Sequence, residues 1–188
     1  METCTIFFIG KPGCGKGTQA KLLAEHTGWP VFGSGQEFRK IAEEPTVVGK
    51  KVKQEIDAGL LSPPWFAMYL YQKALFSIPE RQSAIFDGFN RKVPEAELIV
   101  DSLTWLDRPF WVVDVVISDE EAAKRIAIRK LESDRVDDQF VPERLKEYNK
   151  FTKDALEIFR TAGKLIEING EQTREAIAED VRKALAIK

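Results

Sequence analysis

A glycine-rich turn near the start of the chain carries the clearest chemical signal. Residues 10–18 read GKPGCGKGT, directly after an apolar run and at the start of an amphipathic stretch. Glycines let the backbone curl so that successive N–H groups point inward, and a helix start adds the positive end of its dipole. Lys16 adds a full positive charge. The pattern predicts a phosphate-binding loop rather than a turn that merely happens to contain a lysine.

The residue after this lysine departs from the strict form of such loops. That form has Ser or Thr there to ligate Mg²⁺, whereas here Gly17 intervenes and the hydroxyl comes at Thr18. Thr18 is therefore kept only as a second candidate for the metal. The loop indicates nucleotide phosphate binding, and it does not distinguish a GTPase-like switch, a small-metabolite kinase and a nucleotide kinase.

An aspartate and two arginines elsewhere could complete a phosphoryl-transfer site. Asp87 ends an apolar run, where it could hold waters on Mg²⁺ or simply cap the end of a strand. Arg91 follows and could fork onto a phosphate. Arg39 comes shortly after Ser34, a candidate helix N-cap, and on its own it is better read as a solvated surface charge.

Four further arginines surround one short connection. Arg125 and Arg129 are four residues apart and therefore share a helical face, and Arg135 and Arg144 lie beyond them. Each alone is explained by an ordinary exposed helix. Together they predict a movable cationic cover over polyphosphate, which would stabilise developing charge and exclude water.

The elements that must position these residues alternate along the chain. Short apolar runs predict strands at 5–9, 31–32, 83–86, 111–117 and 165–168. Apolar residues at helical spacing predict helices at 18–25, from 46 to a stop at Gly59, at 145–159 and at 177–185. This alternation is typical of a parallel sheet wrapped by helices. The four tryptophans are expected to be packing residues.

Composition narrows the class of protein. The 188 residues suit one domain, and a net charge of −2 favours neither a nucleic-acid nor a membrane partner. No segment approaches the roughly 20 apolar residues that span a bilayer. Cys4 and Cys14 lack zinc-ligand spacing and are expected to be reduced rather than paired, as in a cytoplasmic protein. A monomer is expected, since no exposed apolar stripe is obvious.

Taken in order, these segments resemble the adenylate kinase family of nucleoside-monophosphate kinases, and the resemblance covers nearly the whole chain. GKPGCGKGTQA at 10–20 is similar to the family's phosphate-binding loop, and DGFNR at 87–91 to its DGFPR motif. Further segments continue the match: SGQEFR at 34–39 (the family's TGDxxR), DAGLL at 57–61 (its acceptor-base loop), RIAIRKLESDRVDD at 125–138 (its short lid) and RLKEY at 144–148.

The resemblance implies an α/β fold of the P-loop NTPase class, a three-layer sandwich around a five-stranded parallel sheet of order 2-3-1-4-5. Residues 1–188 would form a single kinase domain. A helical lobe at about 34–63 would bind the nucleoside monophosphate, and a short lid would span about 126–138. Because this lid contains no cysteine, the zinc-bearing long-lid type is excluded.

The resemblance also implies reversible phosphorylation of AMP to ADP by ATP with Mg²⁺. The residues it assigns to ATP are Gly13, Cys14, Gly15, Lys16, Gly17, Thr18, Arg125, Arg129 and Gln172. Those it assigns to the monophosphate are Ser34, Arg39, Leu60, Leu61, Ser62, Gly88, Phe89, Asn90, Arg91, Glu95, Arg135 and Arg144. Lys16, Arg91, Arg129, Arg135 and Arg144 would act on the transferring phosphate. Asp87 would hold the metal through water.

Three departures from the family pattern concern the metal and the backbone. Gln36 stands where the family usually has Asp, which is expected to loosen the outer shell of the metal. Asn90 replaces the usual proline before Arg91, and a modest backbone effect is expected. Two residues are missing between Asp138 and Arg144, so the position of Arg144 is less well determined than those of the other arginines.

A fourth departure concerns the acceptor base, because Glu95 stands where the family's Gln reads the adenine of AMP. Gln can donate to adenine N1 and accept from the N6 amino group, whereas an ionised Glu only accepts, which suits the N1–H and N2 amino group of guanine. An unmatched buried group costs about 1–3 kcal/mol, a factor of roughly 5–150. One hypothesis is therefore an altered base preference, for GMP, CMP or UMP. In the competing account, Glu95 turns to solvent and backbone groups near Leu60–Ser62 read adenine.

Other functions are distinguished by what they require. A small-metabolite kinase would not need the loop at 57–62, and a GTPase-like switch would need an NKxD segment, of which none occurs. A catalytically weak nucleotide-binding homologue would bind ATP without turning over any acceptor.

Overall fold

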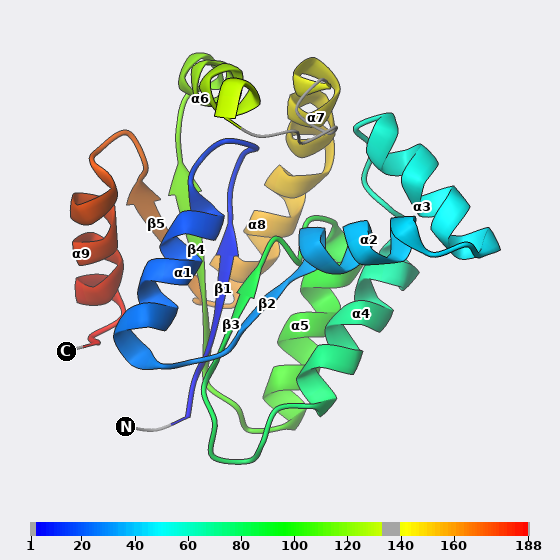
Figure 1. Cartoon of the computed structure of the whole chain (residues 1–188). Coiled ribbons are helices and arrows are strands. Elements are labelled where there is room, and N and C mark those ends of the chain that lie inside the picture. Colours follow the sequence, from blue (N-terminus) through cyan, green and yellow to red (C-terminus); the bar gives the residue numbers. More distant parts are fainter. Residues whose placement is uncertain (1–2, 133–139, 188) are drawn as a thin grey trace.

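The computed structural model describes residues 3–132 and 140–187, which build a parallel sheet between two layers of helices (Figure 1). The strand order is β2-β3-β1-β4-β5, and every described pairing is parallel, as predicted. The strands are β1 (Thr5–Ile9), β2 (Val31–Gly33), β3 (Ala84–Asp87), β4 (Phe110–Val116) and β5 (Leu165–Asn169). The predicted strands are confirmed, with ends shifted by no more than one residue.

The helices follow the strands in sequence and cover both faces of the sheet. They are α1 (Lys16–Thr27), α2 (Ser34–Glu43), α3 (Val47–Asp57), α4 (Pro64–Phe76), α5 (Val93–Trp105), α6 (Asp119–Glu132), α7 (Val141–Glu147), the π-helical turn η2 (Tyr148–Thr152), α8 (Lys153–Thr161) and α9 (Arg174–Ala184). None of the helices in the described ranges is long and apolar enough to cross a membrane.

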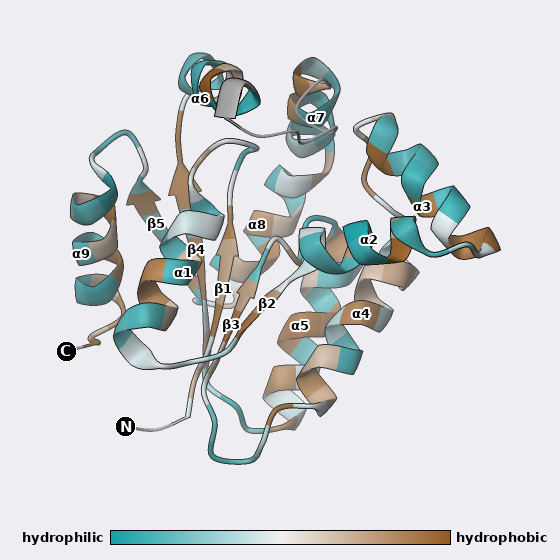
Figure 2. Ribbon diagram, in the orientation of Figure 1, coloured by the Kyte–Doolittle hydropathy of each residue, from teal (hydrophilic) through white to brown (hydrophobic). Residues whose placement is uncertain are grey.

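The central strand β1 joins two hydrophobic cores. Its alternate residues point to opposite faces, so Phe7 packs with α4, α5 and α8, while Phe8 packs with α1 and α9. Phe7 stacks on Phe86 of the neighbouring strand at 5.0 Å between ring centroids. Burial on both faces explains why β1 and its neighbours read as continuous apolar runs, which appear as brown strands in Figure 2.

The carboxyl ends of the strands point toward α6 and α7, and α2 with α3 stands beside that edge (Figure 1). The glycine-rich turn after β1 and the Asp87 end of β3 therefore lie at one edge of the sheet, because parallel neighbours end on the same side. This edge is where the residues singled out from the sequence come together.

Two sequence expectations are corrected by the fold. The N-cap of α2 is Gly33, not Ser34, because Ser34 already has helical backbone and is buried. The expectation that all four tryptophans are packing residues is wrong, because Trp65 and Trp105 are 66% and 80% exposed on α4 and α5. The exposure of Trp65 also removes the reason for expecting a monomer, which stays a prediction.

Candidate active site

The phosphate-binding loop has the curled backbone that its glycines predict. Gly13 and Gly15 adopt left-handed φ values of 83° and 95°, and a Cβ on Gly13 would lie 2.9 Å from the carbonyl oxygen of Ala122. Lys16 opens α1 and donates from Nζ to the carbonyl oxygens of Gly10 and Lys11, each at 3.3 Å. Its ammonium thus lies over the loop itself, where a phosphate would be met by both the charge and the backbone amides.

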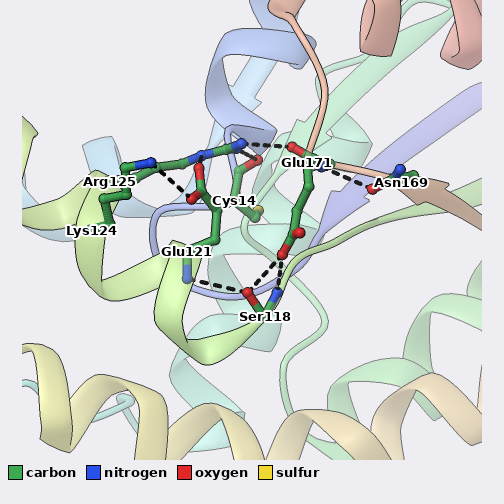
Figure 3. Close-up of polar contacts among 8 residues, drawn as sticks. Cys14, Ser118, Glu121, Lys124, Arg125, Asn169 and Glu171 are labelled. Atoms are coloured by element: carbon green, nitrogen blue, oxygen red, sulfur yellow. Dashed lines mark hydrogen bonds and ion pairs between the residues drawn. The ribbon is translucent and has the colours of Figure 1, made fainter.

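The loop is fastened to its neighbours by two cations. Lys11 donates to the carbonyl oxygen of Ile117 at 2.8 Å and pairs with Asp119 at 2.6 Å. Figure 3 shows the second cation: Arg125 donates to the Cys14 carbonyl oxygen at 3.4 Å.

The same guanidinium reaches two further partners (Figure 3). Arg125 donates to the carbonyl oxygen of Gly170 at 2.9 Å, and its Nε pairs with Glu121 at 2.6 Å. Arg125 therefore joins the loop, α6 and the β5–α9 connection, and it does not line the cavity described below.

Asp87 lies directly against the first turn of α1. A Cβ on Gly17 would be 3.0 Å from Asp87 Oδ2, so the glycine that interrupts the strict loop pattern makes room for this carboxylate. Asp87 Oδ1 is buried without a hydrogen-bond partner among the described residues. An orphaned carboxylate oxygen beside a phosphate-binding loop fits an ion of the Mg²⁺ kind, held directly or through water.

One cavity of about 570 Å³ brings the loop and four arginines together. Arg39, Arg91, Arg129 and Arg144 all line it with Lys16, although they come from α2, the segment after β3, α6 and α7. Burial is the largest cause of the lowered pKa of Lys16, and the charges of Arg91 and Arg144 lower that pKa further. The chemistry best matched to so many cations around one cavity is the binding of polyphosphate.

The lining of the cavity includes a buried carboxylate. Glu95 is only 6% exposed and lines the cavity, and its Oε2 accepts from the Arg91 backbone N–H at 2.8 Å. Burial raises the pKa of Glu95, opposed by that hydrogen bond and by the charges of Arg91 and Lys92. The competing account requires Glu95 to turn to solvent, and the structure instead buries it.

A second buried carboxylate lies under the phosphate-binding loop. Asp114 on β4 is 4% exposed, and its Oδ1 has no partner among the described residues. Burial, followed by the nearby charge of Glu167, raises its pKa to about 6, while Lys16 lowers it. Asp114 was not singled out from the sequence, although a carboxylate within an otherwise apolar strand is a signal that could have found it.

The cavity brings together most of the residues expected from the sequence. Those that line it are Gly13, Gly15, Lys16, Gly17, Thr18, Ser34, Arg39, Leu60, Leu61, Ser62, Asp87, Gly88, Phe89, Arg91, Glu95, Arg129 and Arg144. Cys14, Asn90, Arg125 and Gln172 are not among its lining residues. Gln172 instead bonds to the Asn169 carbonyl oxygen and to Asp180. Arg135 lies outside the described residues.

The backbone at Asn90 corrects one expectation. Its φ is +63°, which the ring of a proline, fixed near −65°, cannot reach. The prediction of a modest backbone effect is therefore wrong, since the chain takes a left-handed step here before Arg91.

Sequence reasoning assigned no role to three cavity residues at the end of α7 and in the turn that follows it. Glu147, Tyr148 and Thr152 line the cavity, and Thr152 is fully buried and donates to the Arg91 carbonyl oxygen at 3.2 Å. Tyr148 and Thr152 begin and end the π-helical turn η2, a feature often found at functional sites. The one available signal was the tyrosine of the RLKEY segment.

Comparison with known proteins identifies a family for the chain. The family model described as adenylate kinase matches residues 8–164. The chain is 34% identical to the adenylate kinase of Bacteroides fragilis, over 96% of this chain and 97% of the relative. It is 31% identical to the adenylate kinase of Maricaulis maris, over 97% and 99%, and 30% identical to adenylate kinase 1 of a Nostoc species, over 96% and 97%.

Proposed function

The chain belongs to the adenylate kinase family, and from this premise we propose that it transfers a phosphoryl group reversibly between ATP and AMP. An oxygen of the AMP phosphate attacks the γ-phosphorus of ATP in line. The bond from that phosphorus to the β–γ bridging oxygen breaks, and two ADP molecules result. The observation that carries the proposal is the single cavity in which Lys16 and four arginines meet the phosphate-binding loop.

The residues divide the work by position. The amides of residues 13–18 and Lys16 would hold the donor phosphates. Arg39 and Arg91 would grip the acceptor phosphate, and Arg129 and Arg144 would stabilise charge on the transferring group. Arg135 is proposed for the same task on the strength of the family motif alone. No general base is needed, because transfer between phosphates depends on positioning and charge stabilisation.

Mg²⁺ is proposed as the ion that accompanies ATP, with Asp87 as the residue that holds its waters and Thr18 as a second candidate. When bound, the ion would neutralise charge on the phosphates and fix their geometry. The orphaned Oδ1 of Asp87 supports this placement. No zinc is proposed.

Several coarser features follow the same proposal. We infer a single kinase domain with an acceptor lobe at about 34–63 and a short lid at about 126–138. A monomer is kept as the proposed active unit. Cys4 and Cys14 are free thiols, which supports a cytoplasmic location.

The test is ADP formation by the purified chain with ATP, Mg²⁺ and one monophosphate at a time. AMP is expected to be turned over, and Lys16→Met is expected to abolish turnover because it removes the charge at the donor phosphates. Binding of ATP without turnover of AMP, GMP, CMP or UMP would identify a binding protein and overturn the proposal.

A second candidate differs only in the acceptor base, and the burial of Glu95 favours it. A carboxylate held in the cavity by the Arg91 N–H can accept hydrogen bonds and, when ionised, cannot donate them. Turnover of GMP at a rate comparable to AMP at equal concentration would support this candidate. Exclusive and efficient use of AMP would remove it.

A further inference from the structure

Among the described residues, the wall of the acceptor lobe at residues 60–62 has one backbone–backbone hydrogen bond, from the Leu60 N–H to the Glu55 carbonyl oxygen at 3.0 Å. This segment connects α3 to α4 and is neither helix nor strand, yet Leu60, Leu61 and Ser62 all line the cavity. A cavity wall built from loop backbone holds its shape only where other groups satisfy its carbonyls and amides. Two charged side chains from distant parts of the chain do so here.

The first is Lys92, which directly follows Arg91. Its Nζ donates to the carbonyl oxygens of Ser62 at 3.0 Å and Leu61 at 3.3 Å. The same ammonium lies 4.9 Å from the centroid of the Phe151 ring in η2, a distance typical of a cation–π contact. One side chain thus connects the acceptor wall, the start of α5 and the π-helical turn.

The second is Glu147, at the end of α7. Its Oε2 accepts from the Leu61 backbone N–H at 3.3 Å. Lys92 and Glu147 therefore hold opposite polar groups of the same short segment, a cation on the carbonyls and a carboxylate on the amide. All three hydrogen bonds involve a charged partner, the stronger kind.

The position of Lys92 is otherwise unfavourable. It is the N-cap residue of α5, where the positive end of the helix dipole disfavours a cation and where Lys offers no capping acceptor. A lysine placed there is better explained by the contacts of its ammonium than by the stability of the helix.

We propose that Lys92 is a positioning residue that fixes the Leu61 and Ser62 carbonyls as the wall against which the acceptor nucleoside is seated. This inference rests on the proposed function, since it deepens the account of the acceptor site. Lys92 does not line the cavity and does not touch the transferring group. Its loss changes how the acceptor is held and leaves the donor site and the chemistry intact.

Three variants test the proposal. Lys92→Met keeps the length of the side chain and removes the donors, and Lys92→Arg restores charge and donors. Lys150→Met is the matched control, because Lys150 lies 4.7 Å from the same Phe151 ring but is exposed, and its described contacts do not reach residues 61 and 62. Each variant is assayed for the KM of ATP, the KM of the acceptor and kcat.

For Lys92→Met we expect the KM of the acceptor to rise roughly 5- to 20-fold, with less than a twofold change in the KM of ATP and in kcat. Lys92→Arg is expected to recover most of the loss, and Lys150→Met to match the wild type. Equal changes in both KM values, or an unchanged KM of the acceptor, would overturn the positioning role.

Hydrogen–deuterium exchange of the free protein separates this proposal from the proposed function. Amides at residues 58–62 are expected to exchange faster in Lys92→Met than in the wild type or in Lys150→Met, because the segment loses its clamp. Unchanged exchange would overturn the clamp whatever the kinetics. If the wild type turned over no monophosphate, the proposed function would fail and the exchange measurement alone would decide the clamp.

Discussion

Replacing Glu95 by Gln is expected to shift the choice of acceptor base toward AMP. In the wild type, Oε2 accepts from the Arg91 N–H at 2.8 Å, and the side chain is largely buried, so a bound acceptor would leave little room for water to replace a missing partner. An ionised carboxylate presents only acceptors to adenine N1, whereas Gln can donate to N1 and accept from the N6 amino group. The substitution changes the hydrogen-bonding pattern and hardly changes the shape.

The size of the shift follows from the burial. An unmatched buried polar group costs about 1–3 kcal/mol, so the ratio of kcat/KM for AMP over GMP is expected to rise roughly 5- to 150-fold in Glu95→Gln. The assay is the initial rate of nucleoside diphosphate formation with each monophosphate at matched concentrations. Glu97→Gln is the control, because Glu97 is exposed on the same helix and the variant makes the same change of charge.

The pH dependence gives an independent check. Burial raises the pKa of Glu95, so its neutral form, which carries an O–H donor, persists to higher pH than in an exposed glutamate. The AMP-to-GMP ratio of the wild type is therefore expected to increase as pH falls, while that of Glu95→Gln stays flat.

The contrary result has a definite structural meaning. Glu95 is the third residue of α5, and its carboxylate accepts a hydrogen bond from the backbone N–H of Arg91, just before the helix begins. A residue in this position can serve simply as a helix cap. If the variant changed thermal stability but left the ratio unchanged at every pH, Glu95 would be a capping residue and its base-reading role would be refuted.

Three more predictions concern single positions of the site. Asp114→Asn is expected to raise the free energy of unfolding by up to about 3 kcal/mol at pH 7.5 and by little at pH 4. The pKa of Asp114 is raised from 3.8 to about 6, so its ionised form becomes costly only as pH rises through that range. Urea unfolding at both pH values measures the two gains, and equal gains would contradict this account. Gly17→Ala is expected to lower kcat about tenfold, because the new Cβ would lie 3.0 Å from Asp87 Oδ2 and displace that carboxylate. The measurement is the reaction rate as a function of Mg²⁺ concentration. An unchanged rate would show that the site tolerates the displacement of Asp87. Asn90→Pro is expected to lower the free energy of unfolding by about 3 kcal/mol, whereas Asn90→Gly is expected to be at least as stable as the wild type. The reason is that proline cannot reach the φ of +63° at this position and glycine can. Equal stability of the two variants in denaturant unfolding would refute this account.

The sequence predicted the features of the fold that are encoded locally. The positions of the strands and the loop at residues 10–18 were foreseen because apolar runs, glycines and a lysine keep their meaning wherever they lie in the chain, whereas the order of the strands in the sheet was expected only from the family resemblance. The convergence of Arg39, Arg91, Arg129 and Arg144 on one cavity was expected from the motif order, and the structure brings these residues together.

Features that depend on distant partners were not predictable in this way. The role of Lys92 depends on carbonyls about 30 residues earlier, and its ring partner Phe151 lies in a π-helical turn that no spacing indicated. The exposure of Trp65 was missed for a different reason. Helix α4 is apolar almost all round, so its periodicity could not show which face is buried against the sheet.

The central position of β1 has a consequence for synthesis of the protein. The first strand made is also the one that needs two later partners, β3 at residues 84–87 and β4 from residue 110. At roughly 5–20 residues per second, the uncharged segment TIFFI waits several seconds outside the ribosome with both edges open. Unpaired strand edges are prone to aggregation, so pauses placed before residue 110 are expected to reduce the yield of the protein.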